Sequence, residues 1–235
     1  MPKIKFKIDF KEDARNWVRI INAKKNKFGN SYGYMIGRIE KDLLKKIKEA
    51  SSREKAEKVV FDYLKKESDN FVPEMKAVQK MLEFYLQEKG DDLFKLIEKI
   101  TEKPMYTDTF NATFTLMSSC PYNSKTNWFM VMGQKPTTRQ VTNIFHEILH
   151  LQFIHYYQDY CKERGLTKQQ FEDLKEALTF LLNEPEFDDF FLAPDYSYNN
   201  HIELRKKLKN YWRRTKSFEK LIDKGIDLVE EKIKI

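Results

Sequence analysis

The stretch that decides the fold is residues 144–151, which read IFHEILHL. Its polar residues follow the pattern H-E-x-x-H, with His146, Glu147 and His150 set among apolar side chains. Residues four apart lie one above the other on a helix, so the two imidazoles can reach one metal ion. Glu147 is turned by about 100° from His146, which places it near the water that such an ion activates. The stretch therefore predicts a largely buried helix that carries a metal site.

This match is specific for a chain of such composition. Only four histidines occur among the 235 residues, and we estimate roughly one chance in 150 that two of them flank a glutamate at this spacing. Buried histidines need partners, and a shared metal ion would provide one. The alternative is a pair of hydrogen-bonded core histidines beside an exposed glutamate.

The segments around the motif predict a small sheet followed by two helices. Residues 109–118 (TFNATFTLMS) alternate like a strand, and residues 128–132 form a second strand after a turn-rich segment, so we expect a hairpin. A capping box, Thr137 to Gln140, opens the helix of the motif, which we expect to reach about Lys162. A second capping box, Thr167 to Gln170, opens the next helix.

The first hundred residues predict a strand and then helices. Residues 4–10 alternate apolar and polar, as a strand does. Amphipathic helices follow, and we expect breaks at a capping box from Ser51 to Glu54, near Pro73 and at Gly90. The fold class expected is α+β and predominantly helical, with a small antiparallel sheet. We expect an N-terminal strand and helical section over residues 1–104, and a core with a C-terminal helical tail over residues 105–235.

A catalytic zinc site usually has three protein ligands and one water, so a third ligand is needed. In metzincins this ligand is a histidine six residues after the second motif histidine, but Tyr156 stands there. His155 lies about half a turn around the helix and would point away from the ion. Neither of these residues supplies the ligand.

The best candidate for the third ligand is Glu176, at the head of the apolar run 177–182. A carboxylate there is costly unless it is paired or bound to a metal. The 26 residues from His150 (176 − 150 = 26) leave room for the first helix to end at Gly165 and the chain to return alongside. Glu172 and Glu184 remain as rival ligands.

These residues resemble the gluzincins, the thermolysin-like zinc metallopeptidases. In that group a second helix with Asn-Glu-Ala and an apolar stretch follows the HExxH helix. Here the matching residues are Lys175, Glu176 and Ala177, so asparagine is replaced by lysine. The resemblance covers roughly residues 110–185. It implies a zincin-like core in which His146, His150 and Glu176 hold Zn²⁺.

The resemblance also implies catalytic roles. Glu147 would be the general base and later the proton donor. A residue beyond the second helix would stabilise the oxyanion, and His201 is the first candidate, with Tyr196 and Tyr198 as alternatives. The edge strand of the small sheet would pair with the substrate backbone, and residues 127–132 are its counterpart here.

A second family that uses HExxH, the peptide deformylases, has cysteine as its third ligand. Cys120 could be offered for that role, but it lies in SSCPYN rather than in the Glu-Gly-Cys-Leu context of that family. The glycine-rich segment of the deformylases is missing as well. We therefore prefer the glutamate ligand.

The net charge of +7 comes from lysines interspersed with glutamates, as in KDLLKKIKEA, which is typical of solvated helix faces and argues against nucleic acid. We see neither a signal peptide nor an apolar run of about 18 residues, so we expect a cytoplasmic protein without a membrane partner. The function expected is zinc-dependent hydrolysis of peptide bonds in a peptide or protein substrate. The alternative is a non-enzymatic helical module that binds peptide or nucleic acid around a structural metal, for which no convincing fourth ligand is found.

Overall fold

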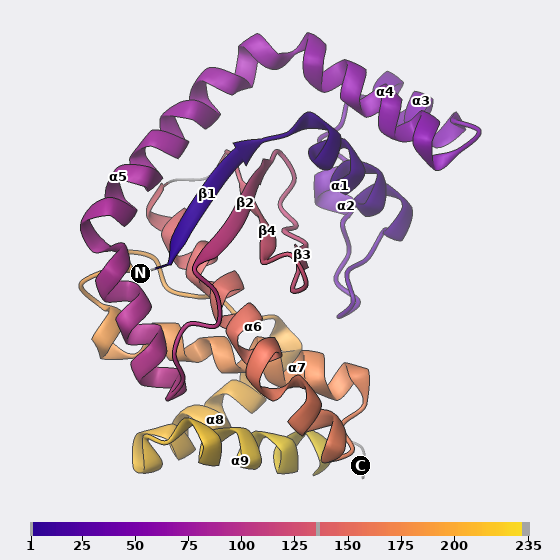
Figure 1. Cartoon of the computed structure of the whole chain (residues 1–235). Coiled ribbons are helices and arrows are strands. Elements are labelled where there is room, and N and C mark those ends of the chain that lie inside the picture. The colour runs from indigo at the N-terminus through magenta and orange to yellow at the C-terminus, as the bar shows by residue number, and fades with distance from the viewer. Residues whose placement is uncertain (1, 135–136, 232–235) are drawn as a thin grey trace. The chain divides into compact units, whose positions relative to one another are not determined.

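The computed structural model describes residues 2–134 and 137–231. The chain is mostly helical and has one small mixed sheet (Figure 1). The strands are β1 (Lys3–Ile8), β2 (Thr109–Thr115), β3 (Tyr122–Asn123) and β4 (Trp128–Met132). The α-helices are α1 (Phe10–Ala23), α2 (Gly33–Ile36), α3 (Lys41–Glu49), α4 (Arg53–Lys66), α5 (Ser68–Thr101), α6 (Thr137–Glu163), α7 (Lys168–Leu178), α8 (Ile202–Thr215) and α9 (Phe218–Glu231). Short 3₁₀ helices are η1 (Thr179–Asn183), η2 (Pro185–Phe187) and η3 (Asn199–His201).

The chain divides into two compact units. Unit 1 comprises residues 1–3, 84–109 and 137–235, and unit 2 comprises residues 4–83 and 110–136. Each unit thus contains segments from before and after residue 104. Unit 1 holds α6 to α9, whereas unit 2 holds α1 to α4 and almost all of the sheet. Among the described residues, no helix is long and apolar enough to cross a membrane.

The sheet has the strand order β1-β2-β4-β3 (Figure 1). Strands β2 and β4 are parallel, in register from Asn111 opposite Trp128 to Thr115 opposite Met132. The predicted hairpin and the antiparallel sheet are therefore wrong. The connection of 12 residues (128 − 115 − 1 = 12) is long enough to return the chain to the start of its neighbour, which a parallel pair requires.

The prediction that residues 127–132 form an edge strand is also wrong. β4 lies between β2 and β3 in the strand order. The turn-rich segment before β4 supplies β3, which pairs antiparallel with it at Phe129 and Trp128. The strand β3 could not be predicted from this segment, because two residues are too few to show an alternation of apolar and polar side chains.

The helices agree with the sequence in type and differ in where they break. α5 is continuous through Pro73 and Gly90, so both predicted breaks are wrong. Leu82 and Leu93 are fully buried on either side of Gly90, and packing of this kind overrides the low helix propensity of glycine.

The predicted helix starts agree with the structure more closely. α4 begins one residue later than predicted, because Ser52 is its N-cap and its side chain accepts a hydrogen bond from the Lys55 N–H. The capping box of Thr167 and Gln170 is confirmed at the start of α7. The capping role predicted for Thr137 concerns a side chain outside the described part of the chain.

The core of unit 2 contains a buried carboxylate. Asp13, on α1, is 2% exposed. The Thr115 hydroxyl donates to its Oδ1 over 2.5 Å, and the Leu116 N–H donates to its Oδ2 over 3.2 Å. Burial raises the pKa of the Asp13 carboxyl to about 7, although these hydrogen bonds act in the opposite direction.

Asp13 should make stability depend on pH. Between the pKa of an unfolded aspartate, about 3.9, and the folded value, the folded chain keeps a proton that the unfolded chain has lost. The free energy of unfolding therefore falls as pH rises from about 4 to 7, by a few kcal/mol from this group. Urea unfolding across this range should show the decline in wild type and in the exposed control Asp62→Asn, but not in Asp13→Asn. The same dependence of the free energy of unfolding on pH in wild type and in Asp13→Asn would contradict this prediction.

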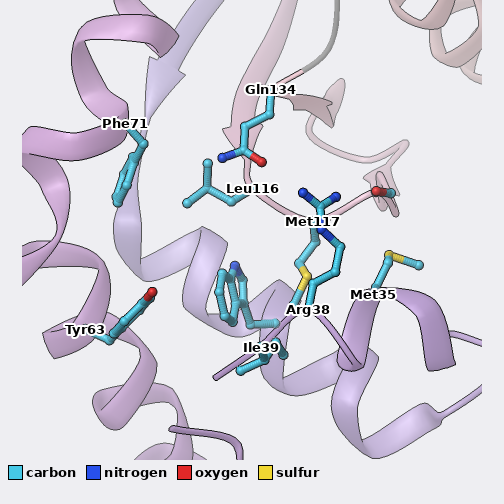
Figure 2. Close-up of a pocket in the computed structure, with 10 residues that line it drawn as sticks. Met35, Arg38, Ile39, Tyr63, Phe71, Leu116, Met117 and Gln134 are labelled. Carbon is cyan, nitrogen blue, oxygen red and sulfur yellow. The ribbon is translucent and has the colours of Figure 1, made fainter. Parts of the chain in front are cut away.

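Unit 2 also contains a half-open cavity of about 220 Å³ (Figure 2). Leu116 follows β2 and Gln134 follows β4, so the cavity lies at the carboxyl ends of the parallel pair. Phe71 and Met117 give it apolar walls, and Arg38 adds a cationic group. None of the residues predicted for the metal site lines it.

Candidate metal centre

α6 places the H-E-x-x-H residues in the middle of a buried helix. Ile144, Phe145, Ile148 and Leu149 around the motif are each at most 1% exposed. The motif residues themselves differ in how far their side chains are exposed to solvent. His150 is buried, whereas His146 keeps 18% of its side chain exposed and Glu147 is half-buried. One edge of the motif is therefore partly exposed to solvent.

α7 brings the third candidate ligand to this helix. After α6 ends, Gly165 adopts φ +86°, a left-handed conformation that favours glycine. The Thr167 cap then starts α7, which packs against α6 (Figure 1). Glu176, 8% exposed, faces the two motif histidines from α7. The turn and return that the 26-residue interval predicted are thus present.

The three candidate ligands meet at one point. Glu176 Oε1 lies 3.3 Å from His150 Nε2, and Glu176 Oε2 lies 3.6 Å from His146 Nε2. One ligand atom from each residue can be chosen so that all lie within 4.8 Å of one another. Tetrahedral zinc with bonds of 2.0–2.1 Å needs about 3.3 Å between ligand atoms. The donor set of two imidazoles and one carboxylate could hold a metal ion, and these are ligand types that zinc accepts.

A further carboxylate, which the sequence did not reveal, orients the first histidine. Asp195 Oδ1 lies 2.7 Å from His146 Nδ1. A partner on Nδ1 fixes the ring and leaves Nε2 directed at the cluster, as is usual for metal-bound histidines. Asp195 lies 49 residues after His146 (195 − 146 = 49) in a loop without regular structure. No spacing rule connects two such positions.

Asp195 is itself held firmly. Its Oδ2 accepts a hydrogen bond from Arg205 Nη1 over 2.9 Å and lies 2.7 Å from the Thr179 hydroxyl. The Asn183 amide bonds both the N–H and the C=O of the Asp195 backbone. The partner of His146 therefore belongs to a connected buried network that keeps it in place.

The charges at the site are strongly coupled. Burial lowers the pKa of His146, but Asp195 and Glu176 outweigh it and raise that pKa to about 10. Burial and the Lys175 ammonium hold the pKa of His150 well below its usual range. Burial opposes ionisation of Glu176, yet the histidines and Lys175 lower its pKa. The site thus concentrates ionised carboxylates around two imidazoles, a suitable arrangement for a cation.

Lys175 pairs with Glu172, the nearest rival ligand, as well as with Glu176. Its buried Nζ lies 3.0 Å from Glu172 Oε2 and 3.4 Å from Glu176 Oε1. Glu172 is thereby paired with a lysine beside the cluster. Glu184, the other rival, pairs with Lys216 over 3.1 Å. Cys120 is not among the clustered residues either.

The predicted oxyanion donors lie outside the cluster. His201 is 1% exposed, and its Nε2 lies 2.9 Å from Asp173 Oδ1. A role for His201 in oxyanion binding would compete with this contact, and it stays a prediction. Tyr196 and Tyr198 are 60% and 38% exposed. His155 stacks on Tyr106 with ring centroids 4.6 Å apart, away from the ligand set.

Removing the carboxylate behind His146 should weaken metal binding. In Asp195→Asn the ring would lose an anionic partner, and such losses typically cost 10–100-fold in metal affinity. We expect a fall of about that size in zinc affinity, measured by competition with a chromophoric chelator. The exposed control Asp189→Asn should bind zinc like wild type. Equal affinities for wild type and Asp195→Asn would show that the contact does not orient a ligand.

Comparison with known proteins gives no further guidance. No protein-family model, no curated protein and no solved structure matches this chain. Its function therefore has to be inferred from the chemistry of the site.

Proposed function

We propose that this chain is a zinc-dependent hydrolase of the gluzincin type that cleaves peptide bonds. The observation that carries the proposal is the convergence of His146, His150 and Glu176 from two helices, with one ligand atom of each within 4.8 Å of the others. Asp195 behind His146 adds the partner that metal-bound histidines usually have. Three protein ligands leave a position for a reactant, which favours a catalytic over a structural site.

The residues of the site would have two roles, metal binding and proton transfer. His146, His150 and Glu176 would hold Zn²⁺, whose chemistry is that of a Lewis acid that polarises carbonyls and acidifies water. Glu147 stands next to His146 on α6 and is half-buried. Its carboxylate would accept the proton of the attacking water and return it to the leaving amine.

Cleavage of peptides before and after metal removal tests this function. A mixture of internally quenched peptides should be cut by zinc-loaded protein, should resist protein treated with a chelator, and should be cut again after zinc is restored. Absence of cleavage by fully loaded protein, or cleavage that survives chelation, would overturn the proposal.

A further inference from the structure

Three polar residues of α6 before the motif, Arg139, Gln140 and Asn143, share the face of the metal ligands. At about 100° per residue, the positions of Arg139, Gln140 and Asn143 fall within an arc of about 120° that also contains the three motif residues. The remainder of this part of the helix is largely apolar and buried, as at Val141, Ile144 and Phe145. A polar strip therefore leads from the start of α6 to the metal centre.

This strip carries hydrogen-bonding groups that the described part of the chain does not satisfy. Gln140 is 0% exposed, yet neither its amide oxygen nor its nitrogen has a partner. The Asn143 Nδ2 and the Arg139 Nε are likewise buried without one. Buried polar groups are seldom left unpaired in folded proteins, so three side chains with such groups on one face indicate a place where a ligand or ordered water binds.

Arg139 adds a positive charge to the strip. Its guanidinium lies 4.2 Å from the ring centroid of Tyr196, and within residues 2–134 and 137–231 it makes no ion pair. It belongs to the first turn of α6, where the helix dipole already disfavours a cation. The Arg139 guanidinium and the positive end of the helix dipole together favour the binding of an anion at the start of α6.

Two consecutive residues of one loop, Asp195 and Tyr196, link Arg139 to the metal centre. Tyr196 packs on Arg139, and its neighbour Asp195 contacts His146. His146 follows Arg139 by seven positions on the helix, a rise of about 10 Å. An extended peptide covers about 3.3 Å per residue, so a group bound at Arg139 lies about three residues from a scissile bond at the metal.

We propose that Arg139, assisted by the Asn143 amide, binds a carboxylate of the substrate, so that acidic peptides are the substrate class. This inference rests on the proposed function, since it assigns the recognition element of the same site. Arginine pairs with carboxylates through two parallel hydrogen bonds, and asparagine can donate one more. The carboxylate comes either from an Asp or Glu side chain or from the C-terminus of the peptide.

Peptide binding to the Glu147→Gln protein tests the inference without any need for turnover. The probes are coumarin-labelled hexapeptide amides with Glu or Gln at one position, scanned along the chain, and the Gln peptide with a free C-terminus. By fluorescence anisotropy, a carboxylate peptide should bind at least about tenfold more tightly than the neutral Gln amide. Tighter binding of the Glu amide identifies a side-chain carboxylate, and tighter binding of the free acid identifies the C-terminus.

Variants of arginine give the control. The preference should vanish in Glu147→Gln/Arg139→Met, remain in part in the Arg139→Lys counterpart, and persist in Glu147→Gln/Arg213→Met, which removes an exposed arginine of α8. Equal binding of acidic and neutral peptides, or a preference that survives Arg139→Met, would overturn the inference.

The inference and the proposed function can fail separately. If wild type cleaves peptides but shows no preference that depends on Arg139, the inference is wrong and the proposed function stands. Selective binding at Arg139 without cleavage by zinc-loaded wild type would remove the peptidase function and leave an acidic-peptide site.

Discussion

Glu147→Gln should lower kcat/KM for peptide cleavage by roughly 10²–10⁴-fold, because it removes the general base. Glutamine has nearly the same shape as glutamate but cannot accept the proton of the attacking water. Glu147 is not among the clustered ligands, so the variant should bind zinc as wild type does. The comparison therefore separates proton transfer from metal binding.

The measurement is the initial rate on an internally quenched peptide at saturating zinc, with zinc content recorded for each protein. Glu163→Gln, at the last residue of α6, is the matched control and should leave both quantities unchanged. Activity close to wild type in Glu147→Gln would remove this glutamate from the mechanism. Loss of zinc together with activity would instead give it a structural role.

The second large effect concerns the ligand on α7. Glu176→Ala removes one of three ligands and leaves two imidazoles, so we expect zinc affinity to fall by about a thousandfold or more. Competition with a chelator of known affinity measures this fall. Glu203→Ala, an exposed glutamate on α8, should bind like wild type. Retained affinity in Glu176→Ala would move the third ligand elsewhere.

Glu176→Ala also leaves Lys175 buried beside fewer negative charges. Lys175 would keep its 3.0 Å contact with Glu172 but lose the one with Glu176. An uncompensated buried charge is destabilising, so unfolding of each variant should be followed by circular dichroism. Glu176→Gln retains the size of the side chain and separates loss of a ligand from loss of folding.

The candidate site could be predicted from sequence where it depends on local periodicity. His146 and His150 follow from the 3.6-residue repeat, and Glu176 follows from a carboxylate placed directly before an apolar run. Asp195 and Arg205 could not be predicted in this way, because a loop and a distant helix bring them to His146. Their positions depend on tertiary packing, which leaves no trace in spacing.

The fold, too, has features that could be predicted from the sequence and features that could not. Helices α6 and α7 were predictable because a capping-box pattern opens each segment and Gly165 separates them. The parallel pairing of β2 and β4 was not, since alternation identifies a strand but not its neighbour or direction. α5 passes through Gly90 because buried leucines on both sides outweigh its local preference.

The central claim is a zinc site built from His146, His150 and Glu176. Elemental mass spectrometry of the untagged wild-type protein, beside Glu176→Ala, tests it most directly. We expect about one zinc per chain in wild type and a sharply lower content in the variant. A wild-type protein that holds no metal even after incubation with zinc would contradict the claim.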